Sequence, residues 1–127
     1  MRTWDEPSLD TLRGHEDAHI AFPNPDGTLH QPTWIWVAPG EGEVFVRSYN
    51  GPGGRWYNAA LERPDGTIEC GGQSFEVTAL PVEANELQRA DEAYLAKYRS
   101  YLDSYLGHML KEPSRGATLK LVPRATS

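Results

Sequence analysis

Apolar and polar positions along the chain predict a fold made mostly of short β-strands. Six runs of β-prone or alternating residues are separated by turn signals, and they cover residues 19–22, 33–37, 43–49, 67–70, 74–80 and 117–122. Asp26-Gly27 marks a turn after the first run, and Gly71-Gly72 is a favourable two-residue hairpin turn. We therefore expect an antiparallel meander that the last run closes.

Apolar residues at helical spacing predict three helices. Pro7 and Ser8 before Leu9 and Leu12 predict a short first helix within residues 5–18. A second short helix is expected over 56–61. The clearest helix is predicted over 90–111, where apolar residues recur three and four positions apart: Tyr94, Tyr98, Tyr101, Leu102, Tyr105, Leu106 and Met109.

The four tyrosines of this predicted helix have two interpretations. Aromatic residues at helical spacing commonly pack against a core. However, a buried hydroxyl needs a hydrogen-bond partner, so tyrosines in place of leucines also fit a wet groove or a subunit contact.

The chain length and the many glycines and prolines favour one mainly β domain. The 127 residues include 12 glycines and 10 prolines, which divide the chain into short pieces. We expect residues 1–127 to form a single barrel or sandwich, with an N-terminal helical segment at 1–18 and a tail at 124–127.

Charge and composition exclude several functions. A formal net charge of −6 would repel a polyanion, so we expect no nucleic-acid partner. No apolar run approaches the roughly 20 residues that span a bilayer, so we expect no membrane partner and a cytoplasmic location. Cys70 is the only cysteine, which excludes an intramolecular disulfide and favours a packing role.

The segment 47–57 is the strongest candidate site. Arg47 and Arg55 flank a glycine-rich loop that precedes a predicted helix start. Free backbone amides, a helix N-terminus and an arginine together can hold a phosphate or carboxylate, although a solvated Arg55 is the alternative. The predicted anion-binding residues are Arg47, Ser48, Asn50, Gly51, Gly54, Arg55 and Trp56.

Trp34 and Trp36 provide a second candidate surface. They lie two residues apart on one predicted strand, so their side chains face the same side, opposite Ile35 and Val37. One face would line a barrel interior, and the other would be covered by a helix or a second subunit. A flat ring could stack on the tryptophans, and core filling is the alternative.

His15-Glu-Asp-Ala-His19 formally matches the zinc-protease motif His-Glu-x-x-His. That chemistry requires a helix running through both histidines, whereas the chain turns at once into a β-prone run. A helix end followed by a strand that His19 opens fits better, so we expect no metal.

Several short motifs together point to a known family. They are Ile-Trp-Val at 35–37, Val-Arg-Ser-x-Asn-Gly at 46–51, Trp-Tyr at 56–57, Gly-Gly-x-x-x-x-Val at 71–77 and Leu-x-Leu-Val-Pro-Arg at 119–124. From His19 to Arg124 the sequence resembles a bacterial family of small proteins, the domain of unknown function 2255. More distantly it resembles split-barrel oxidoreductases, namely pyridoxamine-phosphate-oxidase-like flavoproteins and deazaflavin-dependent nitroreductases.

This resemblance implies a six-stranded antiparallel split barrel, with a short N-terminal and a longer C-terminal helix, that is usually a homodimer. FMN or a deazaflavin would place its phosphate in the loop from Ser48 to Arg55 and its ring against the strand of Trp34. The cofactor would supply hydride chemistry on a small organic substrate, with His19, His30 or Tyr57 as candidate proton donors.

Two further functions stay open. Cofactor-binding relatives usually carry arginine or lysine in the turn at residues 25–31, where this sequence has Asp26. A barrel without cofactor, acting as an enzyme or a ligand-binding protein through the same aromatic pocket, is therefore the second hypothesis. The third is a non-catalytic dimeric module.

Overall fold

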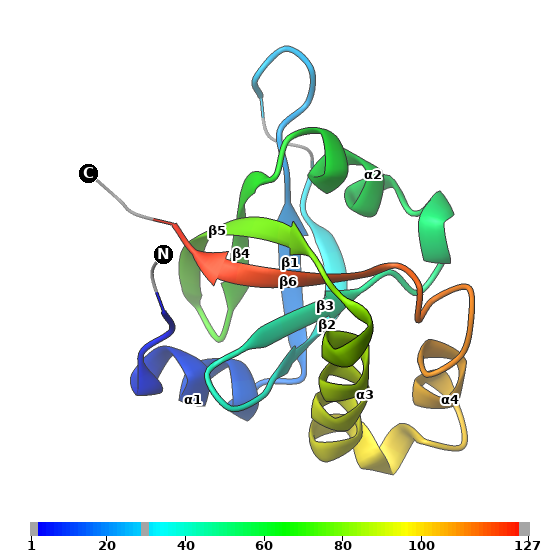
Figure 1. Ribbon diagram of the computed structural model, residues 1–127. Helices are drawn as coiled ribbons and strands as arrows, with labels where there is room; N and C mark the ends of the chain where they lie inside the picture. Colours follow the sequence, from blue (N-terminus) through cyan, green and yellow to red (C-terminus); the bar gives the residue numbers. More distant parts are fainter. Residues whose placement is uncertain (1–2, 29–30, 125–127) are drawn as a thin grey trace.

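The computed structural model describes residues 3–28 and 31–124. In these residues six strands form a closed antiparallel barrel in the order β1-β2-β3-β6-β5-β4 (Figure 1). The strands are β1 (Asp17–Ala21), β2 (Thr33–Pro39), β3 (Val44–Arg47), β4 (Asp65–Cys70), β5 (Gln73–Pro81) and β6 (Thr118–Pro123). The predicted six-stranded antiparallel barrel is confirmed.

Side chains alternate between the two faces of these strands, and the two faces belong to different apolar clusters. One set fills the barrel interior: Ala18, Ile20, Ile35, Val37, Val44, Val46, Ile68, Cys70, Val77, Ala79, Leu119 and Leu121. The outward-facing Trp36, Ala38 and Phe45 belong to a second cluster against the C-terminal helices. The outer face of β2 was expected to be covered by a helix or a second subunit, and helices cover it at Trp36 and Ala38, whereas Trp34 is exposed.

Four α-helices and two short 3₁₀ helices are described around the barrel: α1 (Glu6–Gly14), η1 (Gly51–Gly53), α2 (Arg55–Glu62), α3 (Ala84–Tyr98), η2 (Arg99–Tyr101) and α4 (Tyr105–Met109). Figure 1 shows α1 and α2 near opposite ends of the barrel and α3 against its outside. The backbone amide of Ser8 donates to the Asp5 side chain at 2.8 Å, which caps α1. The short first helix expected within residues 5–18 is thus α1, and β1 begins three residues after its end, at Asp17.

The predicted single helix over 90–111 is wrong at both ends. Helix α3 begins at Ala84, where Glu83 and Glu86 form a capping box. It ends at Tyr98, and the chain then turns through η2 into the separate helix α4. A straight helix over 90–111 would extend for about 33 Å. The turn instead brings Leu106 and Met109 back to be buried in the second cluster.

The tyrosine stripe, which consists of Tyr94, Tyr98, Tyr101 and Tyr105, mainly packs against the rest of the protein. The hydroxyl of Tyr94 donates to the carbonyl of Trp36 at 2.9 Å, and that of Tyr98 donates to the carbonyl of Glu16 at 2.6 Å. Burial raises the pKa of both tyrosines, so they remain donors at neutral pH. Tyr105, by contrast, is 58% exposed. Of the two interpretations, packing holds for Tyr94 and Tyr98, and Tyr105 remains available to a ligand.

Among the described residues, none of the helices combines the length and the apolar character that crossing a bilayer requires.

Candidate functional site

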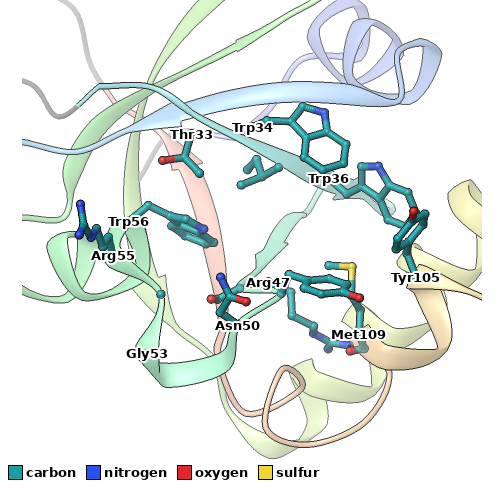
Figure 2. Close-up of a pocket in the computed structure, with 14 residues that line it drawn as sticks. Thr33, Trp34, Trp36, Arg47, Asn50, Gly53, Arg55, Trp56, Tyr105 and Met109 are labelled. Carbon is teal, nitrogen blue, oxygen red and sulfur yellow. The ribbon is translucent and has the colours of Figure 1, made fainter.

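A cavity of about 780 Å³ lies between β2, the loop that follows β3, the start of α2 and α4. Figure 2 shows Trp34 and Trp36 along one side, Trp56 and Arg55 on a second, and Tyr105 and Met109 on a third. The described residues that line it are Thr33, Trp34, Ile35, Trp36, Arg47, Ser48, Tyr49, Asn50, Gly53, Gly54, Arg55, Trp56, Tyr105 and Met109.

Strand β2 supplies the first aromatic wall. The ring of Trp36 stacks on Tyr98 with a centroid distance of 4.1 Å and an interplanar angle of 7°, which fixes its orientation. Trp36 is 7% exposed, whereas Trp34, two residues earlier, is 56% exposed. The two tryptophans therefore form a wall that is rigid at its inner end and open at its outer end.

The glycines of the loop that follows β3 stabilise the loop itself. The amide of Gly51 donates to the carbonyl of Ser48 at 3.0 Å, and the amide of Gly54 donates to the carbonyl of Gly51 at 3.1 Å. Gly51 has a φ of +68°, and a Cβ there would lie 2.9 Å from Cβ of Pro113. These two amides are engaged within the loop rather than free for a ligand, and Gly51 does not line the described cavity.

Helix α2 directs its N-terminus toward the cavity. Gly54 is its N-cap and offers no side-chain cap, so the amides of the first turn carry the positive end of the helix dipole. Trp56 stacks on Phe22 at 6.5 Å and is thereby held at the cavity wall. Arg55 is exposed beside it. Together with Asn50, this end of the cavity can receive an anionic group.

Arg47 lies elsewhere in the cavity and is buried. Its Nη1 donates to Asp91 Oδ1 at 2.8 Å and to the carbonyl of Met109 at 2.9 Å, and its Nε donates to Thr118 Oγ1 at 2.7 Å. Figure 2 shows Arg47 and Arg55 on different sides of the cavity. The two arginines that flank the loop in sequence therefore do not converge on one anion in this structure.

Two of the predicted proton donors, His19 and Tyr57, lie outside the described cavity lining. His19 is on the outer face of β1, opposite Trp34 on β2, with its Nδ1 3.5 Å from Glu69 Oε1. Tyr57 packs edge-on against Trp56. His30 falls outside the described residues.

The zinc-protease motif does not form its helix. His15 follows the end of α1, and His19 is on β1. In the part of the chain that the structure describes, no three histidine, cysteine, aspartate or glutamate residues come together in a way that could hold a metal ion.

Sequence reasoning missed several residues of this site. Tyr49 and Met109 line the cavity, but Tyr49 was not predicted as a site residue and Met109 was only an apolar position of the helix predicted over 90–111. Tyr105 belonged to the tyrosine stripe, which gave a partial signal. Asp91 orients Arg47 from 44 residues away, and Arg115 shares the same carboxylate. The sequence alone does not show that Asp91 and Arg115 surround Arg47, because the folded structure brings them together.

Comparison with known families identifies the family of this chain. A family model described as "Uncharacterized protein conserved in bacteria (DUF2255)" matches residues 8–121. The chain belongs to the DUF2255 family. Among functionally curated proteins, none matches this DUF2255 protein at a significant level.

Solved structures share its fold at low sequence identity. HutZ, described as the haem storage protein from Vibrio cholerae, superposes with a TM-score of 0.69 and 15% identity, covering 99% of this chain and 93% of HutZ. A putative 5-nitroimidazole antibiotic resistance protein from Bacteroides thetaiotaomicron gives 0.65 and 12%, covering 94% and 79%. A putative pyridoxamine 5'-phosphate oxidase from Listeria innocua gives 0.65 and 13%, covering 94% and 93%. The DUF2255 barrel is therefore a split barrel.

Proposed function

We propose that this DUF2255 protein binds a planar aromatic cofactor with an anionic group, FMN or a deazaflavin, and acts as an oxidoreductase on a small organic substrate. The composition of the cavity carries the proposal. Five of its described lining residues are aromatic, two are arginines and none is acidic, although the chain has 18 aspartates and glutamates. Such a surface favours a flat, negatively charged ligand.

The residues present fit such a cofactor at two places. Asn50, Arg55 and the first turn of α2 would hold the phosphate, and the wall of Trp34 and Trp36 would stack against the ring. When bound, the cofactor supplies the hydride chemistry. The chain itself binds and orients the ring and excludes water from its inner face. The similar structure described as a putative pyridoxamine 5'-phosphate oxidase supports a ligand of this kind.

Absorbance of the purified protein and titration with FMN, riboflavin and a deazaflavin test the proposal. Trp34, Trp36 and Trp56 line the cavity, so tryptophan fluorescence reports binding. We expect Arg55→Met to weaken FMN by about tenfold or more while leaving riboflavin unchanged, because a charge-assisted hydrogen bond to phosphate contributes about 1.5–3 kcal/mol. Arg63→Met, just beyond the other end of α2, is the matched control. Failure of all three ligands to bind rejects the proposal.

A cofactor-free pocket is the second candidate, and Asp26 favours it. The Asp26 side chain accepts hydrogen bonds from the Thr28 hydroxyl and, at 3.0 Å, from the Thr28 amide, and these bonds lower its pKa. This turn therefore carries a negative charge where the resemblance to cofactor-binding split barrels implies an arginine or lysine. A colourless protein whose tryptophan fluorescence responds to neutral aromatic ligands, but not to flavins, would support this function.

We also propose that the protein is a homodimer that uses the face around Trp34. A large aromatic side chain that is 56% exposed at the open end of a cavity is suited to being covered by a second copy. His19, opposite Trp34 on β1, would then lie at the interface as a candidate proton donor. Light scattering after size exclusion should show a dimer, which Trp34→Ser weakens and Leu61→Ser, an exposed apolar control on α2, does not.

A further inference from the structure

Arg47 has a donor group that the protein leaves without a partner. The residue is 1% exposed, and its Nε and Nη1 are hydrogen-bonded to Thr118, Asp91 and the carbonyl of Met109. Its Nη2 is buried and has no acceptor among the described residues. A buried charged N–H group without an acceptor is costly, so its presence beside a cavity indicates an acceptor that comes from outside the chain.

The charges around Arg47 do not cancel. Asp91 Oδ1 accepts from Arg47, and Asp91 Oδ2 accepts from Arg115 Nε at 2.9 Å. Among the described ion pairs neither arginine has a second carboxylate, so the cluster of Arg47, Asp91 and Arg115 carries a net charge of +1. The ring of Tyr94, 5.3 Å from the guanidinium carbon of Arg47, contributes a cation–π contact but no charge.

We propose that this cluster, named the inner cation cluster, is a second anion subsite of the cavity. It would bind a carboxylate or an anionic ring oxygen of the ligand, which accepts from Arg47 Nη2. Arg47 is one of the residues that line the cavity, so the group would approach from the cavity side, and the atoms that now shield Nη2 would have to move aside. The subsite is separate from the phosphate position at Arg55, because the two arginines lie on different sides of the cavity (Figure 2).

This inference deepens the proposed function and rests on it for the identity of the natural ligand. A ligand that satisfies both subsites is planar and carries negative charge at two points, one at the mouth and one at the inner end. A cavity with two cationic positions and no described carboxylate would discriminate against neutral aromatic molecules of the same shape.

A pair of matched probes tests the inner subsite without any flavin. The probes are 2-naphthoate and 2-naphthamide, which share a flat ring and differ in charge. Because a hydrogen bond to a charged group is considerably stronger than one to a neutral group, we expect the wild-type protein to prefer naphthoate by at least about tenfold. Tryptophan fluorescence measures both affinities.

Two substitutions that leave Arg47 in place should change this preference in opposite directions. Arg115→Met reduces the charge of the inner cation cluster to zero and should lower the preference for naphthoate several-fold. Asp91→Asn raises the charge to +2 and should increase it. Arg63→Met, at a residue outside the described cavity lining, should leave it unchanged. Structural damage alone would not move the two cluster variants in opposite directions.

The outcomes separate the two proposals. Equal affinity for the two probes, binding of neither, or a preference that depends on Arg55 rather than on Arg115 would overturn the inner subsite. Preference for naphthoate combined with a failure to bind FMN, riboflavin and deazaflavin would keep the inner subsite and reject the flavin proposal.

Discussion

The role of Arg47 is decided by residues that are distant in sequence. Beside Ser48 and the glycine loop, its sequence position predicts a phosphate ligand. In the structure its side chain is buried against β6 and α3, because Thr118 and Asp91 supply acceptors there. Trp34 and Trp36 behave differently, since their shared face follows from the two-residue repeat of a strand alone. Local geometry was predictable at single residues, and long-range partners were not.

At the residue scale, Gly54 and Gly53 should differ sharply on replacement by alanine. A Cβ on Gly54 would clash with Oγ of the buried Ser48, whereas a Cβ on Gly53 meets nothing within 4 Å. Overpacking of this kind typically costs about 1–3 kcal/mol. We expect Gly54→Ala to lower the free energy of unfolding by that amount and Gly53→Ala to leave it nearly unchanged, as measured by urea denaturation. Similar stability of the two variants would contradict the packing role of Gly54.

At the scale of elements, the strands were easier to predict than the long helix. Alternation and glycine turns placed the six strands to within a few residues, because both are local signals. The tyrosine spacing continued through residues 99–104, where the backbone leaves the α-helix without any proline or glycine to mark the turn. Burial of Leu106 and Met109 against the barrel determines that turn, and burial is a tertiary effect that helical periodicity does not encode.

The start of α3 is held by two connections that meet at Glu86. Its carboxylate accepts from Lys120 on β6 and from the backbone amide of Glu83 at 2.9 Å, and these bonds, that from Lys120 above all, lower its pKa. We expect Glu86→Ala to reduce the free energy of unfolding by about 1–2 kcal/mol through loss of the capping box and of the ion pair. Glu86→Gln should have a smaller effect because it retains an acceptor for the Glu83 amide.

Glu92→Ala, on an exposed position of the same helix, is the control for general effects on α3. Thermal unfolding of the three variants should rank Glu86→Ala as the least stable and Glu92→Ala as nearly wild type. A Glu92→Ala variant as unstable as Glu86→Ala would show that the connection to β6 contributes little.

For the whole molecule, buried ionisable groups where α3 packs on the barrel should give stability a maximum near pH 9. Lys97 Nζ donates to the carbonyls of Leu12 and Val37, and burial lowers its pKa to about 8 from an ordinary value of 10.5. Between these values the unfolded chain binds more protons than the native protein, so stability rises with pH. Because one pKa unit corresponds to about 1.4 kcal/mol, the free energy of unfolding should increase by about 1 kcal/mol from pH 7 to 9.

Burial raises the pKa of Cys70 and Tyr98, so the unfolded chain releases those protons first and stability falls at higher pH. Urea denaturation across pH 7–11 measures how stability depends on pH. Lys97→Met should abolish the rise in stability from pH 7 to 9, and the surface control Lys111→Met should retain it. A rise that persists in Lys97→Met would show that another group causes it.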